Sequence, residues 1–189
     1  MVTGDIPIFE DSKGAATPAS APSTRSIPSR YERLQAREER RRPQYETGTD
    51  LEREKFVADR LMEQAGITLE KLPASYGPDY FHPSRIVEIK CRKHAHDTFS
   101  TLILALRKWQ DGVYLSHLMR HAIFQIAVGF TDGIWTLEVT HHTLPDYEIK
   151  WGGRTNEPRD SADVEPVVHI PIVDMTRISQ ASPWDHVRP

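Results

Sequence analysis

The chain has 189 residues, a length that predicts one domain of ordinary size with some flanking sequence. It lacks both the apolar run of about 20 residues that a membrane helix needs and the features of a secretory signal, so we expect a cytoplasmic protein without a membrane partner. The single cysteine, Cys91, excludes an internal disulfide, and the formal net charge of −3 means that nucleic-acid binding would need a local basic patch.

The first 44 residues are expected to lie outside the domain. Residues 1–30 are rich in Ala, Pro, Ser and Thr, which is typical of a flexible tail. Residues 29–42 contain six arginines and three glutamates and have helical composition. This segment fits either a solvated charged linker or a basic arm that touches nucleic-acid phosphates.

The first predicted helix begins near Thr49 or Asp50, either of which can serve as N-cap, and ends before Gly66. A short strand over 67–72 is expected to follow the helix. The inward stripe of the helix consists of Val57, Ala58, Leu61 and Ala65.

Several strands and one more helix follow in the second half of the chain. Residues 85–92 alternate with period two and predict a strand, and a helix is expected from about Arg107, weakened at Gly112. Residues 122–139 predict a hairpin that turns at residues 131–133. Residues 145–166 have a turn-rich composition. A strand is expected near 167–175, and Pro171 either places it at an edge or interrupts it. Residues 179–189 are expected to form a C-terminal tail.

Three residues in the segment 77–93 point to a chemical site. Glu88 and Lys90 are two positions apart on the predicted strand, so their side chains emerge on one face. Asp79 precedes this strand and can converge with Glu88. Two carboxylates form a hard oxygen site that suits Mg²⁺, and a bound water could attack a phosphodiester while Lys90 orients that water or neutralises charge. The alternative is a salt-bridged surface strand after an ordinary Pro-Asp turn.

Pro78-Asp79 followed by Glu88-Ile89-Lys90 resembles the PD-(D/E)XK motif of restriction-endonuclease-like nucleases. The resemblance implies an α/β fold with a core of helix, three strands, helix and strand, in which helices flank a mixed central sheet. Residues 50–139 follow that order, and we place the nuclease domain at 45–178.

The resemblance also implies a metal site and a glutamate on the first helix. Mg²⁺ is the expected cofactor, with Mn²⁺ as a substitute, and the implied metal-binding positions are Asp79, Glu88, Ile89 and the helix glutamate. Glu54 precedes the buried stripe by three, four and seven positions and is our choice. Glu52 remains open, because the stretch around it looks like the start of archaeal junction resolvases.

Three basic residues are candidates for DNA binding. Arg92 and Lys93 continue the motif strand and are expected to meet phosphates, and Lys108 heads the second helix, which often contributes a polar residue in this superfamily. Within this superfamily, the chain resembles phage and archaeal Holliday-junction-resolving endonucleases. The resemblance implies a deoxyribonuclease that acts on branched recombination or repair intermediates, and it is compatible with a homodimer. The alternatives are an exonuclease or restriction-type enzyme of the same fold and an inactive DNA-binding protein.

Overall fold

The computed structural model describes residues 47–73, 76–120, 122–139, 147–153 and 164–186. All of them belong to one compact unit, Tyr45–Pro189. The predicted tail and basic linker at residues 1–44 lie outside the described residues. Within the described part, no helix is long and apolar enough to cross a membrane.

Two sheets and two long helices make up the fold. The helical segments are α2 (Gly48–Ala65), η1 (His96–Thr98), α3 (Leu106–Leu118), η3 (Ile172–Asp174) and α4 (Pro183–His186). The strands are β1 (Glu70–Lys71), β2 (Tyr80–His82), β3 (Arg85–Cys91), β4 (Thr101–Ala105), β5 (Ile123–Phe130), β6 (Gly133–Val139), β7 (Glu148–Gly153), β8 (Val164–Pro171) and β9 (Thr176–Ser179).

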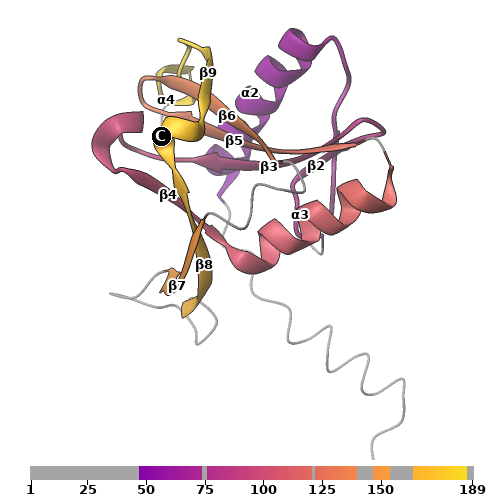
Figure 1. The fold of residues 1–189 in the computed structure, drawn as a ribbon. Coiled ribbons are helices and arrows are strands. Elements are labelled where there is room, and N and C mark those ends of the chain that lie inside the picture. The colour runs from indigo at the N-terminus through magenta and orange to yellow at the C-terminus, as the bar shows by residue number, and fades with distance from the viewer. Residues whose placement is uncertain (1–46, 74–75, 121, 140–146, 154–163, 187–189) are drawn as a thin grey trace, which may run out of the picture. The chain divides into compact units, whose positions relative to one another are not determined.

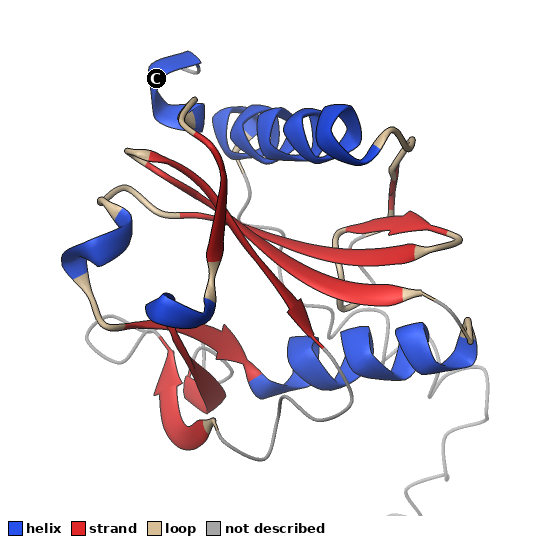
Figure 2. Ribbon diagram, turned by 45° about the horizontal axis from the view of Figure 1, so that its top comes forward, coloured by secondary structure: helices blue, strands red, loops and turns tan. Residues whose placement is uncertain are grey.

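The central sheet has six strands in the order β1-β2-β3-β5-β6-β9. Only β3 and β5 are parallel within it, so the sheet is mixed. Figures 1 and 2 show α2 on one face and α3 on the other. The predicted α/β core is confirmed, in the order α2, β1, β2, β3, α3 and β5, with β4 inserted before α3.

Helix α2 has clear signals at both ends. The side chain of Thr47 accepts a hydrogen bond from the Asp50 N–H, and the Asp50 carboxylate accepts one from the Thr47 N–H. Thr47 is therefore the N-cap, two or three residues before the predicted position, because Asp50 acts as the third helical residue of a capping box. Gly66 ends the helix at φ 63°, as predicted.

The core consists of two apolar layers, one on each face of the central sheet. Helix α2 and the β3 residues Val87 and Ile89 form one layer. Trp109 of α3, Ile86 and Phe124 belong to the other. The strand that carries the motif is therefore packed on both sides, which fixes where its charged side chains emerge.

Gly112 allows α3 to approach the sheet closely. A Cβ atom at this position would lie 2.3 Å from the ring of Phe124, which is fully buried. We expect Gly112→Ala to lower the free energy of unfolding by about 1–3 kcal/mol through overpacking, despite the better helix propensity of alanine. Urea unfolding measures this change. A stabilised variant would show that the ring can move, and Gly48→Ala, where nothing lies within 4 Å, is the matched control.

The second sheet differs from the sequence-based expectation. Strand β8 lies at the centre of the order β4-β8-β7, because Pro171 falls on its last residue and does not break the pairing. Strand β7 lies inside the stretch predicted as turn-rich.

Residues 179–186 also pack as part of the domain, since Ser182 is fully buried and donates a hydrogen bond to the Phe130 carbonyl.

Candidate active site at the edge of the central sheet

Asp79 lies beside the part of β3 that no longer pairs with the neighbouring strand β2. Strand β2 pairs with β3 only as far as Tyr80 and Val87. Beyond that point the Ile89 N–H donates a hydrogen bond of 2.7 Å to Asp79 Oδ2, and the Asp79 N–H donates to the Val87 carbonyl at 2.9 Å. The motif strand itself therefore holds the first acid in place.

Glu88 and Lys90 emerge together on the α3 face of the sheet. The Glu88 side chain is fully buried, and Lys90 Nζ lies 2.6 Å from its Oε1 atom. Lys108 of α3 approaches the same carboxylate, with Nζ at 2.7 and 2.9 Å from the two oxygens and 3.5 Å from Asp79 Oδ1. One ammonium group thus bridges the two acids.

Burial and neighbouring charges move the pKa values of the two acids in opposite directions. Burial raises the pKa of Glu88 above its ordinary value, although Lys90 and Lys108 oppose this effect. Burial also acts to raise the pKa of Asp79, but Lys108, Lys90 and the Ile89 N–H outweigh it, so the net pKa is lowered. The pKa of Lys108 is raised, because its two carboxylate partners outweigh burial. Asp79 is therefore the more firmly ionised acid.

Glu54 approaches the site from the opposite face of the sheet. Its side chain is buried, whereas Glu52 is exposed. Lys71 of β1 forms an ion pair with Glu54, and its Nζ atom also lies 4.0 Å from Asp79 Oδ1. The acids Glu54, Asp79 and Glu88 are thus linked through lysines, with Asp79 between the other two.

The structure adds Lys71 and Tyr80 to the residues named from sequence. Burial, followed by the charge of Glu54 and a hydrogen bond to it, raises the pKa of Tyr80. The position of Lys71 depends on the pairing of β1 with β2, which sets Lys71 opposite Tyr80. The only local signal for this pairing is the short strand predicted over 67–72.

The other predicted site residues lie along the same strand and beyond its end. The Ile89 side chain is buried on the α2 face, so only its main chain faces the acids. Arg92 is half-buried and Lys93 is exposed. Burial lowers the pKa of Arg92, and the Cys91 and Glu88 side chains oppose the effect.

The donor set fits a divalent cation. Within the described residues, no three His, Cys, Asp or Glu side chains form a group that could hold a metal ion. Two carboxylates, however, lie around the Lys108 ammonium, so a positive charge already occupies the position between them. Mg²⁺ commonly uses only one or two carboxylates and completes its shell with water and substrate phosphates, so a pair of carboxylates such as Asp79 and Glu88 is chemically compatible with it.

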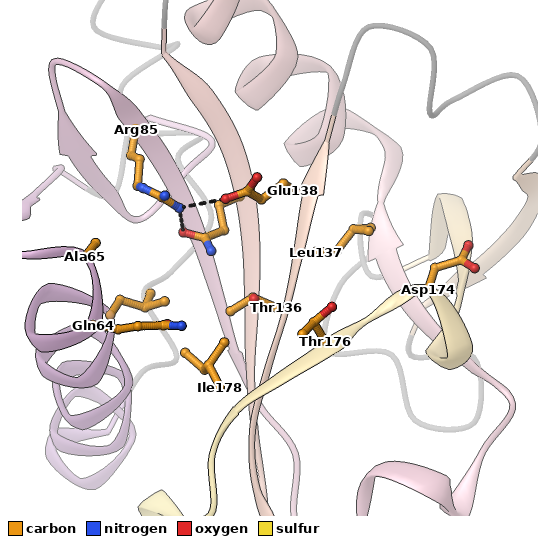
Figure 3. A pocket seen from close by; sticks show the side chains of 11 residues that line it. Gln64, Ala65, Arg85, Thr136, Leu137, Glu138, Asp174, Thr176 and Ile178 are labelled. Carbon is orange, nitrogen blue, oxygen red and sulfur yellow. Dashed lines mark hydrogen bonds and ion pairs between the residues drawn. The ribbon is translucent and has the colours of Figure 1, made fainter.

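A polar pocket of about 480 Å³ lies elsewhere, beside the C-terminal end of α2 (Figure 3). Among the described residues that line it, the basic one is Arg85, which is already bonded to Gln125 at 2.7 Å and to Glu138 at 3.1 Å. Asp174 adds a second acid to the lining. This pocket would therefore repel a DNA phosphate rather than bind it.

Comparison with known proteins agrees with the geometry of the motif. The model of a family described as "Phage putative PDDEXK endonuclease" matches residues 40–178, which include both long helices and the motif strand. Searches among curated proteins and among solved structures gave no match. The match covers most of the chain, so the protein belongs to this phage PDDEXK endonuclease family and hence to the PD-(D/E)XK nuclease superfamily.

Proposed function

We propose that the protein is a Mg²⁺-dependent endonuclease that hydrolyses DNA phosphodiester bonds, with branched recombination or repair intermediates as its substrates. The observation that carries the proposal is the pair of acids Asp79 and Glu88 converging on one cation position, with Lys90 at 2.6 Å from Glu88. Carboxylates that share a cation beside a lysine suit the charge that develops during phosphodiester hydrolysis.

Each residue has a proposed task. Asp79 and Glu88 would hold the metal, and Glu54 would either contribute through a water or keep Lys71 in place. When bound, the metal supplies a nucleophilic water and stabilises charge on the phosphate. Lys90 orients the attacking water, and Arg92 and Lys93 contact neighbouring phosphates.

We further propose that the protein acts as a homodimer. The described residues contain one Asp79–Glu88 pair per chain, whereas symmetric cleavage of both strands at a branch takes two such sites. Light scattering coupled to gel filtration measures the mass, which should be twice that of the 21.6 kDa chain.

The test is a cleavage assay on four-way junction, flapped, linear duplex and single-stranded DNA, in parallel with Mg²⁺, Mn²⁺ or EDTA. We expect metal-dependent internal cleavage that is fastest on a branched substrate. Progressive digestion from ends would instead identify an exonuclease. Cleavage that continues in EDTA, or no cleavage of any substrate, contradicts the proposal.

The two glutamates of α2 are expected to behave differently. Glu54→Gln should lower cleavage about 10- to 100-fold, because the buried carboxylate lies next to the residues that hold the metal. The matched variant Glu52→Gln changes an exposed carboxylate in the same helix and should leave the rate unchanged. Initial rates on one substrate compare the two, and a larger loss in Glu52→Gln would assign the helix position to Glu52.

Removing the ammonium of Lys108 is expected to strengthen metal binding. Lys108→Met takes a positive charge away from the position between the two acids, so Mg²⁺ should bind about tenfold more tightly. Isothermal titration calorimetry in the absence of DNA measures this directly. The control, Lys55→Met, changes a lysine paired with Asp59 on the exposed side of α2. Equal or weaker Mg²⁺ affinity in Lys108→Met would rule out competition for the site.

A further inference from the structure

A second pocket lies where the chain leaves β3 and crosses to β4. Its volume is about 420 Å³, within the usual range of small-ligand sites. Aromatic and aliphatic side chains make up much of its lining, together with the basic residues Arg92, His94 and His96. The lining residues used below are Arg92, His94, Phe99, Leu102, Phe130 and Ile172.

This pocket begins where the row of active-site side chains ends. Glu88 and Lys90 share the α3 face of β3, and the Arg92 N–H extends the β3–β5 pairing by donating to the Gly129 carbonyl. Arg92 therefore continues the same face, about 13 Å from Glu88 at the usual strand rise. A DNA strand held at Glu88 and Lys90 reaches the pocket within a few nucleotides.

Phe99 lines this pocket with an aromatic ring. It is 59% exposed, so a large part of the ring is open to solvent. His94 contacts it edge-on, with ring centroids 4.9 Å apart and planes at 84°. An exposed ring beside basic side chains is the combination that single-stranded nucleic-acid binders use to stack bases and hold phosphates.

A paired base cannot enter such a pocket, because its faces are already stacked inside the duplex. An unpaired base has both faces free, and the charge of Arg92 complements the phosphate attached to it. The polar pocket beside α2 lacks this combination, since the described residues that line it include two acids and no aromatic side chain.

We propose that the pocket between residues 92–100 and β4, here called the Phe99 pocket, binds an unpaired nucleobase of the DNA strand being cleaved. Phe99 stacks on the base, and Arg92 holds a neighbouring phosphate. The inference rests on the proposed DNA cleavage and names the substrate class: DNA with unpaired nucleotides next to the cut, as in flaps and opened junctions.

The test uses flapped duplexes with the fluorescent base 2-aminopurine at successive single-stranded positions. Binding is measured in EDTA, so that no cleavage intervenes. Stacking on Phe99 should quench the fluorescence at one position, and a fully paired duplex of the same sequence should show no such quenching. Absence of quenching at every single-stranded position would overturn the proposal.

Variants separate base stacking from phosphate binding. Phe99→Ala should abolish the quenching and weaken flap binding about tenfold, with less than a twofold change for the perfect duplex. Phe99→Tyr should retain both properties. Arg92→Gln should weaken both substrates alike and reduce the salt dependence of binding. Equal losses on flap and duplex in Phe99→Ala would reduce the pocket to a general DNA contact and contradict the proposal.

Tyr114→Ala is the matched control, because this ring on α3 is 63% exposed and does not line the Phe99 pocket. It should bind and quench like the wild type. The outcomes distinguish failure of the Phe99 pocket proposal from failure of the proposed DNA cleavage. Metal-dependent cleavage with an unchanged flap preference in Phe99→Ala removes only the Phe99 pocket, whereas no cleavage of any DNA removes the proposed function.

Discussion

A Glu88→Gln variant is expected to cleave DNA at least about 100-fold more slowly than the wild-type chain. The substitution keeps the shape of the side chain but removes the negative charge that accepts a cation together with Asp79. A bound metal is worth several kcal/mol of transition-state stabilisation, which corresponds to this loss of rate. Single-turnover rates at saturating Mg²⁺ measure the effect.

The same variant should be no less stable than the wild type at neutral pH in EDTA. Burial raises the pKa of Glu88 above its ordinary value of 4.5, so the folded state binds this proton more tightly than the unfolded state. The raised pKa therefore favours folding at low pH, and this contribution is lost as the pH rises above 4.5. Because glutamine stays neutral, the stability of Glu88→Gln relative to wild type should increase between about pH 4 and pH 7.

Glu138→Gln provides the control, since this half-exposed acid of β6 lies in the same sheet and pairs with Arg85. It should change neither the rate nor the pH dependence of stability substantially. Glu88→Gln with wild-type cleavage would falsify the assignment of Glu88 to the metal. Thermal unfolding followed by circular dichroism from pH 4 to pH 7 gives the stability comparison.

Trp109→Ala should have the largest effect on stability, about 3–5 kcal/mol. Trp109 is 1% exposed and packs edge-on against Phe124 and Tyr147, with centroid distances of 6.2 and 5.7 Å. It also follows Lys108 directly, so a cavity at this position disturbs the placement of the bridging ammonium. Urea unfolding should show the loss, together with a drop of about 10 °C in Tm.

Trp109→Phe should cost much less than Trp109→Ala. No partner for the buried indole Nε1–H lies among the residues that the structure describes, and phenylalanine removes this unsatisfied donor while it fills most of the space. Trp151→Ala is the control, because this tryptophan of β7 is 75% exposed and should change the free energy of unfolding by less than about 0.5 kcal/mol. A similar loss in Trp109→Ala and Trp151→Ala would contradict the assignment of Trp109 to the core.

The parts of the site that sequence predicts well are those set by local periodicity. Alternation along residues 85–92 places Glu88 and Lys90 on one face, and the structure has them there, 2.6 Å apart. Helical spacing likewise puts Glu54, rather than Glu52, on the buried side of its helix. Both patterns depend on a single element and need no knowledge of its neighbours.

The parts that sequence does not predict depend on long-range pairing. The three-stranded sheet joins β4 to β8, and the register sets Leu102 opposite Ile170 with 67 residues of chain between them. Lys71 reaches Glu54 only because β1 pairs with β2. Strand β7 resembles a loop in its exposure to solvent, since every residue except Gly152 is exposed. Local propensity carries no information about such partners.

Asp79 also affects how the protein behaves at high concentration. Strand β2 covers only part of β3, and a free N–H row on a strand edge can pair with a strand of another molecule. The carboxylate of Asp79 accepts the Ile89 N–H at this uncovered stretch. The acid that we assign to metal binding therefore also blocks the edge against strand addition, and its loss should make the chain more prone to aggregate.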